Sequence, residues 1–346
     1  MFILPSFLED IVQNGQPYQA FAEQINQFIE PRDNFLLSAH INADGDAIAS
    51  VVAMKIYLEK LGKHAVIILH DETVDTRFEY LKHYDEIQCF SKHPDLKKYL
   101  PSGNIENAIF LDVPGLKRLG DISQIVPPLQ NAIKIDHHPS EDRLGQIEWV
   151  DEVASSTTAM VYEIIQNRNI EFDAALASAI YTGIVYDTGR FSFSNTTSRD
   201  LFICAKMAEQ GADPVELTNR IFFQNSFQAL KTIGRGLSSL ENYLDGKVNV
   251  IYLSYEDMTQ KNHGEIEELA NYSVAIRGGE IGLFIREVKP NYHKVSFRSN
   301  STVDVNKIAK VFNGGGHSRA AGCRIEGKKQ TIIPKIINEI ASQISS

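Results

Sequence analysis

Cysteine is scarce in this chain of 346 residues, and long apolar runs are missing. The three cysteines, Cys89, Cys204 and Cys323, are odd in number, lie far apart and lack the spacing of metal ligands. This pattern argues against a disulfide framework and favours a reducing compartment, so we predict a cytoplasmic protein. There is no run of about 18 apolar residues, and we therefore expect no membrane span. Residues 1–5 contain no basic side chain, which argues against a signal peptide.

Positive charge is also in deficit. The formal net charge is −10, which is unfavourable for a protein that binds duplex DNA. The deficit is uneven, because residues 271–346 carry 12 Lys and Arg against 5 Asp and Glu, whereas the rest of the chain carries 22 against 39. An acidic body with a basic C-terminal part fits metal ligands in one region and phosphate contacts in another. Uneven surface charge without any function would give the same counts.

Short apolar runs alternate with helical patterns in the first half of the chain. The composition, 43% apolar and 23% charged, is that of a globular protein, and the length corresponds to about two domains. Apolar runs at 35–37, 65–69, 108–111 and 132–135 read as strands, whereas residues 1–30, 47–61 and 174–185 read as helices. This order predicts a parallel sheet with right-handed crossovers.

We predict an α/β protein with two domains and a connector. The N-terminal parallel-sheet domain covers residues 1–197, a helical connector covers 198–244, and a smaller α/β domain covers 245–346. In the second domain, apolar runs predict strands at 248–253, 281–285 and 294–298, the last two paired, and helices at 304–312 and 332–344.

The stretch from His40 to Asp46 connects the first predicted strand to a helix that starts near Ala47. It brings one imidazole and the carboxylates of Asp44 and Asp46 to the carboxyl end of a strand, where open α/β sheets bind their ligands. Imidazole and carboxylate together suit a divalent ion such as Mn²⁺, and Gly45 allows a tight turn between the two carboxylates. The alternative is that an aspartate simply caps the helix.

Three further groups of polar side chains end predicted core elements. Asp112 follows the strand at 108–111, Asp136-His137-His138 follows the strand at 132–135, and Asp187 ends the helix at 174–185. Alone, each could be a cap or an exposed loop. Neighbouring side chains at a strand end point in different directions, so one histidine can bind metal while the other faces substrate and Asp136 orients a ring. Together they offer enough ligands for two metals that share a carboxylate, about 3.5–4 Å apart.

A glycine run, Gly314-Gly315-Gly316, precedes His317 in the predicted second domain. Bare backbone at glycine lets N–H groups approach an anion closely. The run follows a helix and has no Lys-Ser/Thr after it, so it is not a Walker loop. The alternative is a flexible surface loop.

The ordered motifs resemble those of the DHH phosphoesterase superfamily. They are HxxxDGD at 40–46, the strand-end Asp112, DHH at 136–138, and Asp187 followed by Thr-Gly-Arg-Phe. Phe297-Arg298-Ser299 and the GGGH run resemble its DHH-associated domain. The combination is most similar to the NrnA-type family of bifunctional oligoribonucleases and 3′-phosphoadenosine 5′-phosphate (pAp) phosphatases, over roughly residues 15–345. One departure is Ala43, where the family usually has proline, and this change could loosen the turn.

The resemblance implies an active site in the interdomain cleft, with two Mn²⁺ ions for which Mg²⁺ or Co²⁺ could substitute. One ion would be held by His40, Asp44 and Asp112. The other would be held by Asp46, Asp112, His137 and Asp187. His138 would contact the scissile phosphate, and Asp136 would support the histidines. Arg298, Gly314, Gly315, Gly316 and His317 would hold the substrate's nucleotide or terminal phosphate.

The implied reaction is attack of a hydroxide, activated by two metals, on phosphorus in short oligoribonucleotides, in linear dinucleotides such as pApA, and in pAp. Within the superfamily, a 5′–3′ single-strand DNA exonuclease, a cyclic-dinucleotide phosphodiesterase and an inorganic pyrophosphatase are the alternatives. The acidic body offers little positive surface for binding a long DNA strand, which argues against the exonuclease. Pyrophosphate contains no nucleoside to be bound, so the GGGH run argues against the pyrophosphatase. A non-catalytic nucleotide-binding module would be expected to lack at least one metal-binding residue of the family, and none of these residues is missing in this sequence. We expect no duplex DNA or membrane partner, and a homodimer stays open.

Overall fold

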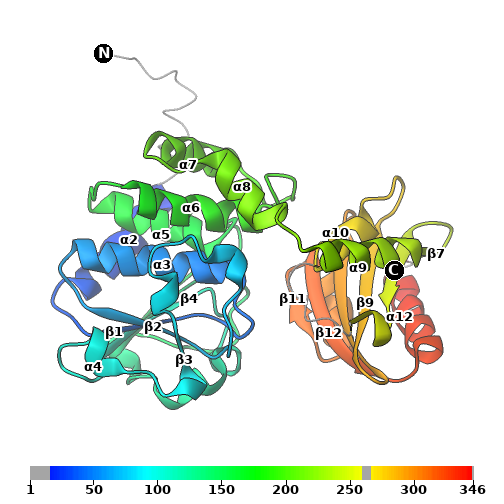
Figure 1. The fold of residues 1–346 in the computed structure, drawn as a ribbon, viewed down its shortest axis with the longest axis horizontal. Helices are drawn as coiled ribbons and strands as arrows, with labels where there is room; N and C mark the ends of the chain where they lie inside the picture. Colours follow the sequence, from blue (N-terminus) through cyan, green and yellow to red (C-terminus); the bar gives the residue numbers. More distant parts are fainter. Residues whose placement is uncertain (1–15, 259–265, 345–346) are drawn as a thin grey trace. The chain divides into compact units, whose positions relative to one another are not determined.

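The computed structural model describes residues 16–258 and 266–344. The chain divides into two compact units, Met1–Gln224 and Asn225–Ser346, which we call the N-terminal unit and the C-terminal unit. Each unit contains one six-stranded sheet (Figure 1).

The sheet of the N-terminal unit is parallel throughout, with the strand order β3-β2-β1-β4-β5-β6. Its strands are β1 (Phe35–Ser38), β2 (Ala65–Leu69), β3 (Gln88–Cys89), β4 (Asn107–Leu111), β5 (Ala132–Asp136) and β6 (Ile147–Val150). Alternate side chains enter opposite cores: Leu37 lies in one hydrophobic cluster and Leu36 in another. A parallel sheet needs both faces covered, which explains why its central strands are apolar almost without interruption.

Most helices of this unit lie on one face of the sheet. They are α2 (Gln16–Ile29), α3 (Gly45–Lys60), α5 (Thr157–Asn167) and α6 (Ala174–Asp187), followed by α7 (Ser198–Glu209) and α8 (Pro214–Phe222), which pack against α6 (Figure 1). The opposite face is covered by α4 (Leu96–Tyr99) and short 3₁₀ turns, including Leu116–Gln124. Side-chain N-caps start the helices, for example Asp44 before α3 and Ser156 before α5.

The C-terminal unit has a mixed sheet with the strand order β11-β12-β10-β9-β8-β7. Its elements are α9 (Phe227–Ser238), β7 (Glu241–Tyr243), β8 (Val248–Leu253), α10 (Leu269–Val274), β9 (Ile281–Lys289), β10 (Tyr292–Ser299), α11 (Val305–Val311), β11 (Gly315–Gly316), β12 (Ala320–Glu326) and α12 (Lys329–Ile344). Residues of α11 and α12 pack on one face of the sheet, and residues of α9 and α10 share a smaller cluster with β8 and Phe284.

The predicted fold class is confirmed: a parallel sheet forms the first domain, and a smaller α/β domain follows. The predicted pairing of the strands near 281–285 and 294–298 is also confirmed, because β9 and β10 form an antiparallel pair. Of the helix expected over residues 1–30, the structure describes α2, and residues 1–15 lie outside the described residues. No helix in the described part of the chain is long and apolar enough to cross a membrane.

The stretch 198–244 differs from its expected all-helical form. It contains α7, α8 and α9, but the last helix ends at Ser238 and β7 follows. Leu244, Asp245 and Gly246 have positive φ angles of 52°, 55° and 86°, and they form the tight connection from β7 to β8. Positive φ is incompatible with a continuing helix, so a strand pair replaces the expected helical end.

Candidate metal centre and substrate-binding residues

The predicted ligands of the N-terminal unit meet at one edge of its sheet. β1 and β4 are neighbours at the point where the strand order reverses, and this switch point is where open α/β sheets bind ligands. His40 lies two residues beyond β1, Asp112 directly follows β4, and Asp136 ends β5. The N-terminus of α3 brings Asp46, and the C-terminus of α6 brings Asp187 to the same group.

Asp112 is the centre of this group. Its Oδ2 lies 3.3 Å from Nε2 of His40, and its Oδ1 lies 3.4 Å from Nε2 of His137 and 3.3 Å from Nδ1 of His138. The hydroxyl of Thr157 donates to the same Oδ1 at 3.1 Å. The backbone of Asp112 is left-handed, with φ of 55°, and its side chain is buried. One carboxylate is therefore shared by three imidazoles.

Asp46 is held by the N-terminus of α5. The amide of Thr157 donates to Oδ2 of Asp46 at 2.7 Å, and the amide of Thr158 donates to Oδ1 at 3.0 Å. The Thr158 hydroxyl also donates to Oδ1. First-turn amides of a helix have no partner within the helix and favour negative charge, so α5 fixes both oxygens of a buried carboxylate.

His137 connects Asp112 to the end of α6. Its Nε2 lies 3.1 Å from Oδ2 of Asp187, and its Nδ1 lies 3.3 Å from the carbonyl oxygen of Ala154. The side-chain Nδ2 of Asn195 donates to the backbone carbonyl oxygens of both Ser155 and Asp187, at 3.0 Å and 3.1 Å. The loop before α5 and the end of α6 are thereby fastened to each other beside the imidazole.

His138 is more exposed than His137, with 23% of its side chain accessible against 6%. The Oδ1 atom of Asp136 accepts the backbone amide of His138 at 3.1 Å and lies 2.9 Å from its Nδ1. Asp136 itself is fully buried, and no hydrogen-bond partner of its Oδ2 occurs among the described residues. Both adjacent histidines therefore contact two carboxylates, and they differ in exposure, because His137 is buried whereas His138 is partly accessible.

Asp44 satisfies both interpretations of its motif. Its Oδ1 accepts the amides of Asp46 and Ala47 as the N-cap of α3, and the same atom lies 3.9 Å from Nε2 of His40. The turn before it is held by Asp71, which accepts the amide of Ala43 at 2.9 Å. The expected loosening of the turn at Ala43 is thus offset by a hydrogen bond that proline could not donate.

Within the N-terminal unit, three sets of described side chains could hold a metal ion, because one donor atom of each member lies within 4.8 Å of the others. The sets are His40, Asp44 and Asp112; Asp46, Asp112 and His137; and Asp112, Asp136 and His138. Asp112 belongs to all three, whereas Asp187 approaches through His137. Imidazole nitrogen and carboxylate oxygen without thiolate is a donor set suited to Mn²⁺, Fe²⁺ or similar divalent ions, so the residues present fit a metal centre.

The protonation equilibria reflect the crowding of carboxylates. Burial, together with the charge of Asp112, raises the pKa of Asp46 to about 7. Burial and the charges of Asp46, Asp44 and Asp112 raise the pKa of Asp187 well above its usual value. Burial also raises the pKa of Asp112, but hydrogen bonds from His137, His138 and His40 outweigh it and lower that pKa well below the ordinary value.

The pKa values of the two adjacent histidines are raised as well. Burial lowers the pKa of His137, but its hydrogen bond to Asp112 and the nearby carboxylate charges outweigh this effect and raise it to about 9. The same balance, with Asp112 and Asp136 as partners, raises the pKa of His138 to about 10. Carboxylates that are forced together in this way favour a positive charge between them, which is the electrostatic condition for binding a cation.

The residues predicted to bind substrate lie together in the C-terminal unit. Arg298 is on β10 and pairs with Ala320 of β12, and the amide of His317 donates to the carbonyl oxygen of Ala320 at 2.8 Å. Nε of Arg298 donates to Oδ1 of Asn271 at 3.1 Å. An arginine, a histidine and the glycine run therefore border one edge of the sheet.

The glycine run is not an open loop. Gly315 and Gly316 form the short strand β11, which pairs with β12. A Cβ at Gly314 would lie 2.1 Å from the carbonyl oxygen of Gly322, and the Gly314 amide donates to Ala309 at 2.9 Å. The expectation of three bare amides is therefore wrong for Gly314, because close backbone packing is its requirement.

Two family models match the chain. The model described as DHH family, N-terminal domain, matches residues 34–184, and the model described as DHHA1 domain matches residues 246–346. The chain belongs to the DHH family. It is therefore a DHH phosphoesterase. The metal-site candidates from His40 to His138 lie in the DHH domain, Asp187 lies three residues after the matched range, and Arg298 and His317 lie in the DHHA1 domain.

Named relatives cover most of this DHH-family chain. The bifunctional oligoribonuclease and PAP phosphatase NrnA of Thermus thermophilus is 29% identical over 84% of this chain and 84% of its own length. The protein of the same name from Bacillus subtilis is 28% identical over 85% of this chain and 90% of its own. An exopolyphosphatase-related protein from Bacteroides fragilis shares the fold, with a TM-score of 0.83, 24% identity and coverage of 94% and 96%.

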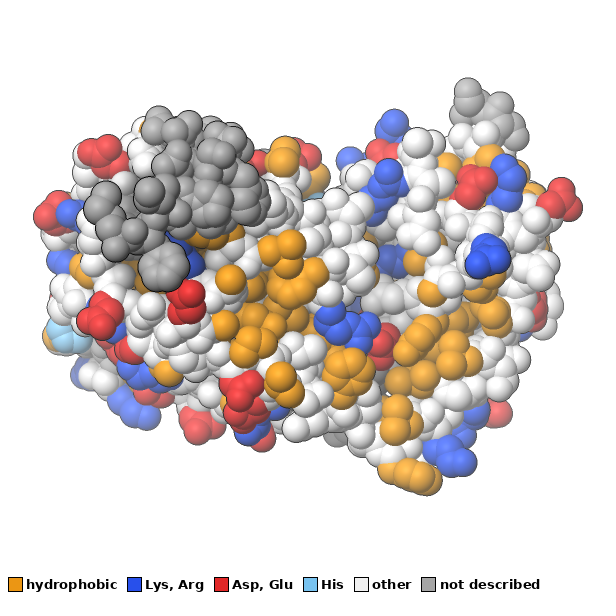
Figure 2. All heavy atoms as spheres, turned by 90° about the horizontal axis from the view of Figure 1, so that it is seen from above, with side chains coloured by type: hydrophobic (Ala, Val, Ile, Leu, Met, Phe, Trp, Pro, Cys, Tyr) orange, Lys and Arg blue, Asp and Glu red, His pale blue; other side chains and the backbone are white. Residues whose placement is uncertain are grey.

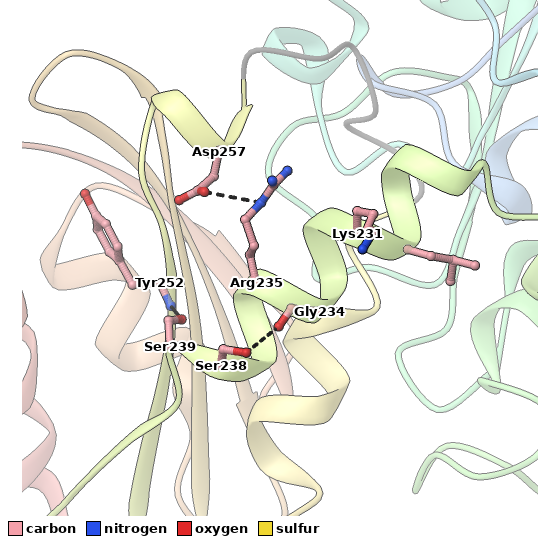
Figure 3. Close-up of a pocket in the computed structure, with 8 residues that line it drawn as sticks. Lys231, Gly234, Arg235, Ser238, Ser239, Tyr252 and Asp257 are labelled. Atoms are coloured by element: carbon pink, nitrogen blue, oxygen red, sulfur yellow. Dashed lines mark hydrogen bonds and ion pairs between the residues drawn. The ribbon is translucent and has the colours of Figure 1, made fainter.

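The DHHA1-containing unit also has a broad surface cavity of about 690 Å³ (Figure 3). It is lined by α9 and β8, with Lys231, Arg235 and Tyr252 on its walls, and Arg235 forms an ion pair with Asp257 at 3.4 Å. Neither Arg298 nor any residue of the glycine run lines it. The cavity is thus separate from the predicted substrate-binding residues.

The surface charge of the DHH protein is mixed. On the face shown in Figure 2, Lys and Arg side chains are scattered over both units and alternate with Asp and Glu.

Proposed function

We propose that this DHH phosphoesterase hydrolyses short oligoribonucleotides, including linear dinucleotides such as pApA, to mononucleotides, and converts pAp to AMP. The observation that carries the proposal is the group of three imidazoles around the shared carboxylate of Asp112, at the switch point of the sheet. The names of the Thermus and Bacillus relatives supply the substrate class. The joint presence of DHH and DHHA1 domains supports it.

The proposed cofactors are two Mn²⁺ ions. His40, Asp44 and Asp112 would hold one ion, and Asp46, Asp112, His137 and Asp187 would hold the other. When bound, two such ions supply an activated water as nucleophile and offset the charge that develops on the phosphate oxygens. Mn²⁺ is favoured over softer metals because every proposed ligand is an imidazole or a carboxylate.

The remaining chemistry belongs to side chains of the chain itself. His138 is the more exposed of the two adjacent histidines, and we assign it to the scissile phosphate. Asp136 orients its ring through the contact between Oδ1 and Nδ1. The N-terminus of α5 keeps Asp46 in one orientation, so that the carboxylate need not rearrange during turnover.

The nucleotide part of the substrate is assigned to the C-terminal unit. Arg298 can form two parallel hydrogen bonds with a phosphate, and His317 adds a donor beside it. Of the glycine run, Gly315 is the position where a ligand can approach the backbone closely, because a Cβ added there would meet no atom nearer than Oδ1 of Asn306 at 4.0 Å. We assign these residues to the recognition of a nucleotide. An inorganic pyrophosphatase would not need such residues, because its substrate has no nucleoside.

The test is a rate assay with Mn²⁺ on five substrates in parallel: pApA, a five-nucleotide RNA, a long single-stranded DNA, pAp and pyrophosphate. Fast turnover of the two short RNAs, with pAp hydrolysis beside it, is the expected result. Preference for long DNA or for pyrophosphate would replace the proposal with that activity. If the protein binds Mn²⁺ but hydrolyses none of the five substrates, the non-catalytic nucleotide-binding module would be the remaining interpretation. An Asp112→Asn protein purified in the same way controls for contaminating nucleases.

A further inference from the structure

The loop from His40 to Asp44 is held through three successive backbone amides. Ile41 donates to the carbonyl oxygen of Arg118 at 2.7 Å. Asn42 donates to Oδ1 of Asp71 at 2.8 Å, and Ala43 donates to Oδ2 of the same carboxylate at 2.9 Å. Both oxygens of Asp71 are therefore engaged by the loop that separates two candidate metal ligands.

Asp71 lies where it can act on this loop from outside the metal centre. It follows β2 by two residues, and β2 is the neighbour of β1, so both chain segments leave the sheet at the same edge. Its side chain is half-buried. Among the described residues, Asp71 belongs to none of the sets whose donor atoms could share a metal ion.

The loop needs an external hold because its conformation is unfavourable by itself. Asn42 has a φ of 56°, in the left-handed region, which asparagine adopts more readily than most residues but which still costs free energy relative to the right-handed region. A carboxylate can accept two neighbouring amides at once, and such charge-assisted hydrogen bonds are stronger than neutral ones. The Asp71 carboxylate is placed to supply this compensation.

We propose that Asp71 is a positioning residue that fixes the 40–44 loop, and through it His40 and Asp44, for one metal ion of the centre. The proposal rests on the proposed function only in requiring that His40, Asp44 and Asp112 bind a metal. Asp71 itself touches neither metal nor substrate. Its removal should leave the second set, Asp46, His137 and Asp187, in place, because α5 and α6 hold that set.

The test measures Mn²⁺ binding to metal-stripped full-length protein by calorimetry, without any substrate. Asp71→Ala removes both acceptors, and Asp71→Asn keeps one, so both variants should bind Mn²⁺ more weakly, the alanine variant more so. Residues that orient metal ligands typically cost about 10–100-fold in affinity when removed, and we expect a loss in this range. Two binding steps are expected, one for each Mn²⁺ ion. The step that the Asp71 variants weaken should be the step that Asp44→Ala abolishes, and the other binding step should be unchanged.

Glu72→Gln is the matched control. It removes the same charge as Asp71→Asn at the neighbouring, exposed position, and no side-chain hydrogen bond from Glu72 to the loop is present in the described structure. Equal weakening in Glu72→Gln and Asp71→Asn would show a charge effect and overturn the proposal. Wild-type affinity in Asp71→Ala, or equal weakening of both steps, would overturn it too.

Urea unfolding of the same metal-free samples separates positioning from folding. If Asp71→Ala does not fold, Asp71→Asn provides the measurement. A variant that unfolds at lower urea but binds Mn²⁺ normally would contradict the positioning role. Wild-type protein that binds Mn²⁺ but cleaves none of the five substrates would refute the proposed function and leave the role of Asp71 standing.

Discussion

At the scale of single residues, the N-terminal unit concentrates its polar contacts on Asp112. Three imidazole nitrogens and one threonine hydroxyl lie within 3.4 Å of its two oxygens. Such a carboxylate cannot be replaced without leaving several buried polar groups unpaired. The same residue is common to every set of donors that could hold a metal within this unit.

We expect Asp112→Ala to abolish hydrolysis of every substrate, because both proposed metal sites lose a ligand. The loss in kcat should exceed about 100-fold, since even residues that only orient metal ligands cost 10–100-fold. Steady-state rates on pApA and pAp, with circular dichroism as a control for folding, check this outcome. Loss on one substrate with full activity on the other would contradict a shared carboxylate.

Which residues could be predicted depends on where their partners lie in the chain. His40, Asp44, Asp46 and Asp112 were accessible to sequence reasoning because each directly follows a strand or begins a helix. Thr157, Thr158 and Asp71 were not, because their role depends on partners 45 to 112 residues away or on a neighbouring strand. In the sequence, Thr157 and Thr158 look like residues of an ordinary helix start, and Asp71 looks like an ordinary aspartate. Nothing in their local sequence indicates these contacts.

At the scale of elements, the packing of α6 against α5 and α3 positions two carboxylates. A Cβ at Gly183 of α6 would lie 2.1 Å from the Thr158 hydroxyl and 2.7 Å from Oδ1 of Asp46. The pattern at 174–185 predicted this helix correctly. It could not reveal that one glycine in that helix makes room for a ligand of another helix.

Gly183→Ala should therefore push α6 away from α5 and disturb Asp46. We expect a destabilisation of about 1–3 kcal/mol from overpacking, together with weaker Mn²⁺ binding. Gly234→Ala in α9 is the matched control, because no atom lies within 4 Å of its added Cβ, and it should stabilise by about 0.5–1 kcal/mol. Urea unfolding measures both variants, and equal effects would show that the contact with Thr158 is unimportant.

A buried lysine of α3 makes the stability of the N-terminal unit depend on pH. Nζ of Lys55 contacts Oε2 of Glu86 at 2.8 Å and the carbonyl oxygen of Ala65 at 3.3 Å. Burial raises the pKa of Glu86, but hydrogen bonds from Lys55 and His83 outweigh it and lower this pKa from 4.5 to about 2. A carboxyl group with a lowered folded pKa stabilises the fold above its unfolded pKa and loses that contribution in acid.

Glu86→Gln should consequently destabilise the protein at pH 7 and make little difference near pH 2. The difference in unfolding free energy between the two proteins should shrink as pH falls from 4.5 towards 2, because in this range the unfolded wild-type chain binds a proton at Glu86 and the folded protein does not. Urea titrations at several pH values provide the curve. A difference that stays constant across this range would show that Glu86 acts through packing rather than charge.

At the scale of the whole molecule, the proposed metal ligands and the proposed substrate-binding residues belong to different units. All proposed metal ligands belong to the N-terminal unit, and Arg298, His317 and the glycine run belong to the C-terminal unit. Composition is consistent with this proposed division, since basic residues predominate only after position 271. The packing of Gly314 on Gly322 was not predictable, because a glycine that avoids a clash and a glycine that admits an anion look alike in sequence.

The division of labour predicts different kinetic effects for the two units. His317→Ala should raise KM for oligoribonucleotides and pAp while leaving kcat nearly unchanged, because a binding contact used equally in ground and transition states alters KM alone. Ser318→Ala, at an exposed position of the same turn, should leave both constants unchanged. If His317→Ala instead lowered kcat as Asp112→Ala does, with KM unaltered, His317 would belong to the reacting centre and the separation of roles would be wrong.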